Sequence, residues 1–161
     1  MREGPAPVVK RADHAAPAYW IRSVELRSDL DPAKTIVGSR MHIERNAEVP
    51  AAPLQLHGEG LNLLRVLADG ESVSFREEAG LLIIDNPPDK PRFTLEIRNT
   101  CAPEKNTQLS GLYTSGGGFY TQCEAEGFRR ISYFLDRPDV MAVFTVTIRA
   151  DKARYPVLLS N

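Results

Sequence analysis

The sequence predicts an all-β domain, an antiparallel β-sandwich, and three observations support this fold class. Apolar and polar residues alternate with a period of two along most of the chain, as they do in half-buried strands. Turn residues separate these stretches about every 8–12 residues, which is typical of a sandwich or barrel. No stretch carries a sustained apolar stripe of helical period, so long amphipathic helices are not expected.

The first two predicted strands form a long hairpin over residues 19–45. Val24, Leu26 and Leu30 alternate with charged residues on the outgoing strand. The sequence Asp-Pro-Ala-Lys at 31–34 then predicts a type I turn, because proline fixes φ at the second turn position. The returning strand repeats the alternation, with Val37, Met41 and Ile43 among its apolar members.

The same pattern predicts short strands at residues 54–56, 61–67, 73–75, 81–84 and 93–98. Asp69-Gly70 is a tight hairpin turn between two of them, since glycine accepts a positive φ. Val73 and Phe75 are expected to face the core. A last strand is predicted at 142–149, where Phe144, Val146 and Ile148 alternate with polar residues.

Residues 111–138 do not follow the strand pattern. They contain three consecutive glycines at 116–118, followed by a charged stretch. Near residues 124–134 we expect one short helix, with Thr121 as a possible N-cap and Glu124 and Glu126 in its first turn. This is the part of the chain that strand formation does not explain.

Composition describes one globular domain. The chain has 161 residues, of which 42% are hydrophobic and 25% charged, and a net charge of -1. Residues 1–17 are expected to form an extended arm and residues 18–161 a single β-sandwich domain. Without a basic excess or a long apolar run, neither nucleic acid nor a membrane is an expected partner.

The cysteine content and the start of the chain favour a cytoplasmic protein. Cys101 and Cys123 are too few for a disulfide framework, and no Cys-x-x-Cys pair is present. The first 20 residues contain no apolar stretch of the kind found in secretory signals. We therefore expect reduced thiols.

The residues alone predict no reaction. His14, His42 and His57 lack metal-binding spacing and are interpreted as solvated side chains. Two interpretations remain open for Glu124 and Glu126. They can be charges at a helix N-terminus, or one can be a carboxylate held beside a glycine loop to bind a cation.

A resemblance goes further than these patterns. The sequence TQCEAEGFRRI at 121–131, followed by YFLDRPD at 133–139, resembles the aminopeptidase N family of zinc metallopeptidases, especially its bacterial alanyl-aminopeptidase branch. The likeness continues through DLDPAKT at 29–35, NTQLSGLY at 106–113, and ADK and YPVLLSN near the end of the chain. The chain as a whole is similar to the N-terminal domain of that family, which also includes leukotriene hydrolase-like enzymes.

This resemblance implies a saddle-shaped β-sandwich over the active-site cleft of a larger enzyme that removes N-terminal amino acids from peptides. Glu124 and Gln122 match the family's substrate contacts, and a cis peptide is implied between Glu124 and Ala125. Zinc and the catalytic residues are implied for a catalytic domain of the same polypeptide. The chain has no His-Glu-x-x-His segment, so we expect it to bind no metal, to contain no catalytic residue and to be inactive alone.

The resemblance also names two expected partners: a peptide with a free N-terminus and the catalytic domain. An apolar patch should then be exposed near residues 111–134 or at 157–159. The alternative function is a self-contained β-sandwich module for binding or interaction. Such a module should expose an aromatic platform, and Trp20 is the only tryptophan.

Overall fold

The computed structural model describes residues 10–11 and 14–160. Most of the predicted arm, residues 1–9 and 12–13, lies outside the described residues. The last residues of the arm are attached to the domain. The guanidinium of Arg137 donates to the carbonyl oxygen of Ala15 over 2.7 Å, and the Asn46 side chain donates to that of Pro17 over 2.9 Å.

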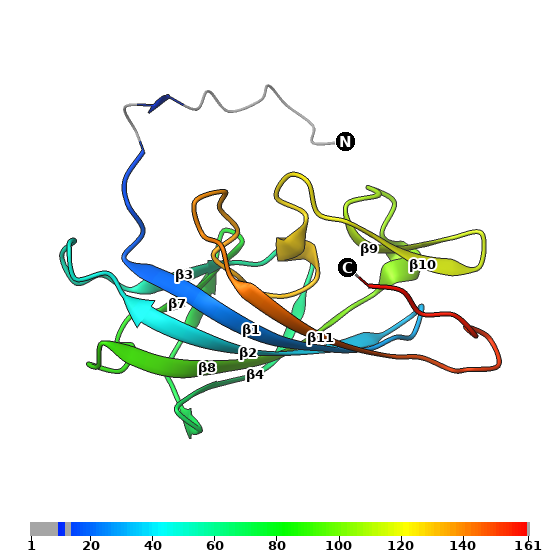
Figure 1. The fold of residues 1–161 in the computed structure, drawn as a ribbon, viewed down its shortest axis with the longest axis horizontal. Coiled ribbons are helices and arrows are strands. Elements are labelled where there is room, and N and C mark those ends of the chain that lie inside the picture. The colour runs from blue at the N-terminus through cyan, green and yellow to red at the C-terminus, as the bar shows by residue number, and fades with distance from the viewer. Residues whose placement is uncertain (1–9, 12–13, 161) are drawn as a thin grey trace.

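The main layer is a six-stranded sheet with the order β11-β1-β2-β8-β4-β5 (Figure 1). Strands β1 and β2 form the predicted hairpin. Strand β11 runs parallel to β1, whereas the other neighbouring strands are antiparallel. The sheet is therefore mixed, whereas the sequence predicted an antiparallel one. The parallel pairing is possible because a long crossover joins β8 to β11. The strands are β1 (Tyr19–Asp29), β2 (Thr35–Arg45), β4 (Asn62–Ala68), β5 (Glu71–Ser72), β8 (Arg92–Cys101) and β11 (Val143–Arg149).

The second layer contains a three-stranded sheet, the 131–135 segment and a hairpin. Its sheet has the order β3-β7-β6, and a backbone bridge between His57 and Phe134 adds the 131–135 segment beside β3. The hairpin β9-β10 precedes that segment in the chain. These strands are β3 (Leu54–His57), β6 (Arg76–Glu78), β7 (Leu81–Ile84), β9 (Gly111–Ser115) and β10 (Gly118–Gln122).

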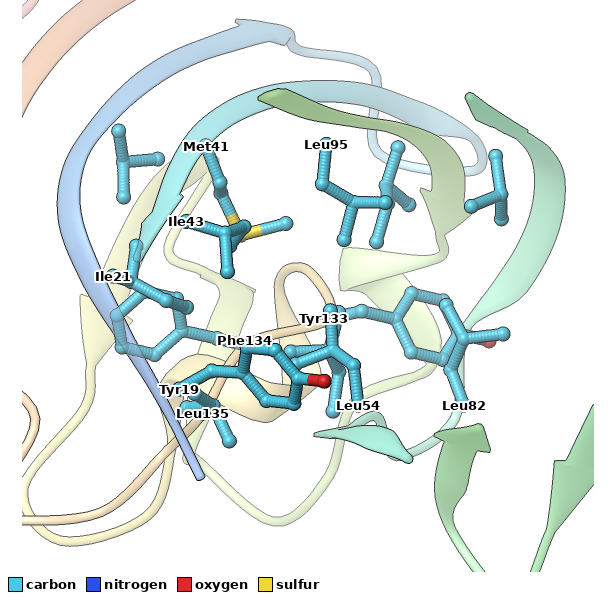
Figure 2. Packing of buried hydrophobic residues seen from close by; sticks show 14 of the residues in the cluster. Tyr19, Ile21, Met41, Ile43, Leu54, Leu82, Leu95, Tyr133, Phe134 and Leu135 are labelled. Carbon is cyan, nitrogen blue, oxygen red and sulfur yellow. The ribbon is translucent and has the colours of Figure 1, made fainter. Parts of the chain in front are cut away.

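The core lies between the two layers. Figure 2 shows Met41, Ile43 and Leu95 of the main sheet packed toward Phe134 and the second layer. The alternation within the strands explains why these residues line the core, because the apolar residues of each period-two stretch point to the same, inner face of the sheet. The predicted strand at 73–75 is wrong, because these residues lie between β5 and β6, and Phe75 is 43% exposed.

A buried polar network joins the main sheet to the second layer. Asn99 of β8 is fully buried, and its amide donates to the carbonyl oxygen of Ile131 over 3.0 Å. The Ser132 hydroxyl lies 3.2 Å from the Asn99 side-chain oxygen and 3.3 Å from the Ser39 hydroxyl. Because these groups satisfy one another away from water, they fix the position of the 131–135 segment on the sheet.

The all-β fold class is confirmed, but the predicted helix near residues 124–134 is not an α-helix. The described residues contain no α-helix, and the longest helical segments among them are the short 3-10 turns η2 (Pro103–Lys105) and η3 (Phe128–Arg130). Glu126 has a φ of 65°, which no residue inside a right-handed helix can adopt. Within the described residues, no helix has the length and apolar character needed to cross a membrane.

Replacing Asn99 tests the importance of the polar network. Asn99→Leu keeps a similar volume but leaves the Ile131 carbonyl without the Asn99 amide and the Ser132 hydroxyl with only its Ser39 contact. We expect the free energy of unfolding to fall by about 1–3 kcal/mol, measured by urea denaturation. The control is Asn62→Leu on β4, because Asn62 is exposed and makes only a 3.4 Å contact with the Thr100 hydroxyl. Equal stability of Asn99→Leu and the wild type would contradict this role of the network.

Candidate functional site

The candidate site is a loop between the β9-β10 hairpin and the buried 131–135 segment. Gln122 is the last residue of β10, residues 123–127 form the turn, and η3 follows directly. Phe128 in η3 packs edge-on against Phe134 and Phe144, with ring centroids 5.1 and 5.5 Å apart. The loop is therefore exposed at its tip and anchored to the core at its end.

The two predicted substrate-contact residues lie next to each other on this loop. The Gln122 amide nitrogen donates to the carbonyl oxygen of Glu124 over 3.1 Å, and both residues are exposed. The peptide between Glu124 and Ala125 is cis, as the resemblance predicted. The loop is closed by a backbone hydrogen bond of 2.9 Å from Gly127 to the carbonyl oxygen of Cys123.

The Glu124 carboxylate differs from the charges around it. It forms no hydrogen bond or ion pair with the described residues. By contrast, Glu126 lies 3.5 Å from the guanidinium of Arg129, and Arg130 donates to Glu59 over 2.6 Å. Among the charged side chains of this segment, Glu124 is therefore the acceptor that is available to a ligand.

Hydrogen bonds between Arg129 and Asp136 stabilise the end of the loop. The Asp136 carboxylate accepts from the backbone nitrogen of Arg129 over 3.1 Å and from its guanidinium over 2.9 Å. The same guanidinium donates to the Asp136 carbonyl oxygen over 2.8 Å. Both side chains are largely buried, so these charge-assisted bonds set the direction in which the chain leaves the loop.

His57 belongs to the same support and is half-buried, whereas the sequence predicted a solvated side chain. Its Nδ1 accepts from the backbone nitrogen of Asp136 over 3.3 Å, and its own backbone pairs with Phe134. Burial, and then the nearby Arg129 charge, lower the pKa of His57. Asp136 and Glu126 act in the opposite direction on this pKa, but the net effect favours neutral imidazole.

The other groups near the loop are poor candidates for chemistry. Partial burial and the Asp136 and Glu124 carboxylates raise the pKa of Cys123, so its thiol stays protonated near neutral pH. Burial raises the pKa of Cys101 to about 11. Residues 10–11 and 14–160 contain no group of three His, Cys, Asp or Glu side chains that could hold a metal ion. The site is thus suited to binding a cationic group and not to activating a nucleophile.

A glycine is needed at position 127 because there is no room for a side chain, and not because of its backbone conformation. Its φ of -88° is open to any residue. A Cβ at this position would lie 2.8 Å from the Cα of Cys123 and 3.1 Å from the nitrogen of Gly111, and would also meet the Gln122 carbonyl oxygen. The close approach of these backbones brings Gln122 to the same tip as Glu124.

Comparison with known proteins assigns the domain to a family. Residues 19–161 match the family model of the peptidase M1 N-terminal domain. The chain therefore belongs to this family of N-terminal domains, which confirms the resemblance seen in the sequence.

Particular relatives agree with this assignment. The chain is 50% identical over 152 residues to aminopeptidase N of Escherichia coli, a match that covers 94% of this chain and 17% of the relative. It superposes with a TM-score of 0.87 and 32% identity on Legionella pneumophila aminopeptidase A, solved in complex with aspartic acid, over 95% of this chain and 18% of that one. A Deinococcus radiodurans M1 zinc metallopeptidase bound to a Tyr-Ser-Ala substrate shares the fold, with a TM-score of 0.70 and 17% identity over 83% of this chain and 33% of that one. The chain thus spans less than a fifth of the length of the aminopeptidase N relative.

Sequence reasoning missed the residues that support the loop. Asp136 lies in the matched YFLDRPD stretch, but nothing local indicated that it binds Arg129. Glu59 and His57 are more than 70 residues away from their partners Arg130 and Asp136 in sequence. Charge alone was a weak signal for these pairs, because the chain has 20 Lys and Arg and 21 Asp and Glu residues.

The close contact at Gly127 can be tested by adding one methyl group. Gly127→Ala should reduce the free energy of unfolding by about 1–3 kcal/mol in urea, since the methyl group must displace backbone atoms. Gly38→Ala is the matched control, because a Cβ there would meet nothing within 4 Å and should be neutral or slightly stabilising. If both variants were equally stable, the close packing of the loop would not be a constraint.

The lowered pKa of His57 predicts a dependence of stability on pH. Below about pH 6.5 the unfolded chain protonates this histidine before the folded chain does, so the free energy of unfolding should fall as pH decreases. The contribution is fully present at higher pH and is lost by at most about 1.36 kcal/mol per pH unit. We expect His57→Asn, compared with wild type by urea denaturation between pH 7.5 and 5, to have a shallower slope. The exposed His42→Asn is the control, and an unchanged slope for His57→Asn would contradict the assignment.

Proposed function

We propose that this domain is the N-terminal domain of a zinc-dependent aminopeptidase that removes N-terminal amino acids from peptides, and that it helps to bind the substrate. Glu124 binds the α-amine of the substrate, and Gln122 lines the pocket for the first side chain. The domain caps the active-site cleft of the catalytic domain in the same polypeptide. The observation that carries the proposal is the Glu124 carboxylate, which is exposed on an anchored loop without a partner among the described residues.

The chemistry of the substrate fits this loop. An aminopeptidase must recognise a free α-amine, whose pKa near 7.7–8.0 leaves it largely cationic at neutral pH. A carboxylate pairs with this ammonium group and so fixes the register of the peptide. The first peptide carbonyl is then placed at the reacting centre, which is catalysis by positioning.

Gln122 is oriented for a complementary role. Its amide nitrogen is used in the 3.1 Å hydrogen bond to the Glu124 carbonyl oxygen, which leaves its Oε1 as an acceptor. This oxygen can accept from the substrate ammonium together with Glu124. Arg129, Arg130 and Glu126 are tied to other groups of the domain and act as support.

Zinc belongs to another part of the enzyme in this proposal. M1 relatives include zinc metallopeptidases, but the described residues offer no set of ligands that fits a metal ion. The metal would polarise the scissile carbonyl in the catalytic domain. The residues of this chain bind and orient the peptide, and none of them takes part in bond cleavage.

Two further observations bear on the proposal. Both cysteines are free thiols, which supports a reducing, cytoplasmic location. A self-contained binding module would need an exposed aromatic platform, but Trp20 is half-buried and the Arg22 guanidinium lies 5.7 Å from its ring centroid. Trp20 therefore does not supply such a platform for the alternative function.

Glu124→Gln in the full-length enzyme tests the proposed contact. The substitution keeps the shape and removes the charge that faces the ammonium group. Losing one partner of a desolvated charge pair costs about 2–5 kcal/mol, so kcat/KM for an aminoacyl amide should fall about 30- to 4,000-fold. Gln122→Ala should cost less, because it removes only neutral contacts.

Glu126→Gln is the matched control for Glu124→Gln. It removes the same charge two residues away, from a side chain that already lies beside Arg129. We expect its kcat/KM to stay within a few-fold of wild type. Normal kcat/KM for Glu124→Gln, at normal zinc content and stability, would refute the assignment of the α-amine contact.

A further inference from the structure

The outer face of the main sheet carries a row of arginines. The second layer packs on the other face of this sheet (Figure 1). Cross-strand pairing places Arg27 of β1 opposite Gly38 of β2, and Gly38 opposite Arg98 of β8. Arg98 in turn lies opposite Arg65 of β4. Four neighbouring strands therefore contribute one line of residues, which we call the arginine row.

The members of the arginine row lie on the face that points away from the core. The three arginines are exposed, whereas the residue that follows each of them in its strand is buried. Successive side chains of a strand point to opposite faces, so the arginines point outward. Gly38 lies between the buried Val37 and Ser39, and a Cβ added to it would meet nothing within 4 Å. The row therefore has an open gap at Gly38.

Two arginines of the row lack a partner of opposite charge. The side chains of Arg65 and Arg98 form no ion pair and no hydrogen bond with the described residues. Arg27 is half exposed and lies 3.3 Å from the Asp29 carboxylate. Like charges directly opposite each other destabilise a pair of strands. The Arg65–Arg98 pair thus carries an electrostatic cost that no carboxylate among the described residues offsets.

Other arginines on the same face are neutralised. Glu44 accepts from Arg22 over 2.8 Å and from Arg92 over 3.0 Å. Arg40 lies 3.7 Å from Glu96, which is its cross-strand neighbour. An unpaired positive charge is therefore a particular property of Arg65 and Arg98, and not of every arginine on this face.

The dimensions of the row limit the class of ligand. Neighbouring strands are about 4.8 Å apart, so the row is about 14 Å long from β1 to β4. Acidic residues lie on both sides of it, with Glu96 in one adjacent row and Asp29 in the other. These carboxylates would repel a broad anionic surface such as nucleic acid or a membrane. Water screens each exposed charge, so a tightly held anion must carry several charges.

We propose that Arg65 and Arg98, with Arg27 across the open gap at Gly38, form a binding site for a small polyphosphate anion, either inorganic or esterified. A guanidinium group offers parallel donors that match phosphate oxygens. One phosphate group bridges Arg65 and Arg98 and screens their repulsion. The rest of the phosphate chain crosses Gly38, where no side chain obstructs it, toward Arg27. This inference does not rest on the proposed function.

Titration with inorganic tripolyphosphate tests the site. We compare variants of the full-length polypeptide by isothermal titration calorimetry at low salt, so that binding elsewhere, including chelation of a metal ion, is common to all of them. Arg65→Gln and Arg98→Gln should each weaken the binding at least about fivefold. Arg22→Gln is the matched control, because it removes the same charge from a side chain that is paired with Glu44. It should bind within about twofold of wild type.

The gap at Gly38 offers a second, independent pair of variants. Gly38→Glu places a carboxylate between Arg27 and Arg98 and should abolish the binding. Gly38→Gln has the same size without the charge and should retain most of it. Both side chains have room, because a Cβ at this position meets no atom within 4 Å. Urea denaturation of each variant checks that the fold is kept.

A nucleoside triphosphate titrated in parallel distinguishes the two sources of the ligand. Equal affinity would identify the phosphate chain alone as the ligand, and tighter binding would identify an esterified form. Absence of tripolyphosphate binding to the wild type, or unchanged binding by Arg98→Gln and Gly38→Glu, overturns the inference. Tighter binding of a polyglutamate peptide than of tripolyphosphate would make the row a docking surface for an acidic protein segment, and would also overturn it.

Discussion

The position of the candidate site depends on how the 131–135 segment is held inside the domain. The side chain of Asn99 satisfies the Ile131 carbonyl and meets the Ser132 hydroxyl, while a backbone bridge joins Phe134 to His57. A buried polar group without a partner costs more than a single hydrogen bond contributes, so these contacts admit few alternative placements. The loop at 123–127 leads into this segment through η3. The fixed position of the segment therefore sets the direction of the loop.

The loop separates charges that stabilise the fold from a charge that is available for binding. Asp136, Arg129, Arg130 and Glu59 neutralise one another beneath the loop. The Arg129–Asp136 pair is largely buried and the Arg130–Glu59 pair partly exposed, and both form without a ligand, so they can hold the backbone of the loop in place. Glu124 has no such partner within the described residues and is exposed to solvent.

Much of the sheet could be predicted because alternation is a local property. The β1-β2 hairpin and the strands at 54–57, 62–68, 81–84 and 92–101 follow directly from it. The helix was wrong because acidic residues before a mixed apolar stretch also suit a tight turn, and the positive φ of Glu126 leaves no sign in composition. The parallel pairing of β11 and the burial of His57 depend on contacts across long sequence separations, which a single sequence does not specify. Gln122 was singled out only through the resemblance, which also favoured one of the two interpretations that the residues had left open for Glu124.

The exposure of the Glu124 loop sets how strongly it can bind a cation. An ion pair in water contributes about 0–1 kcal/mol, because water screens both charges. Glu124 is exposed in this domain, so an ammonium group would gain little from it here. The interaction becomes strong only when another part of the protein excludes water from the pair, as happens in a closed cleft. Phe128, which directly follows the loop, packs against Phe144 of β11. In the proposed function, the catalytic domain would exclude water from Glu124 and so convert a solvated surface charge into a selective contact for a free α-amine.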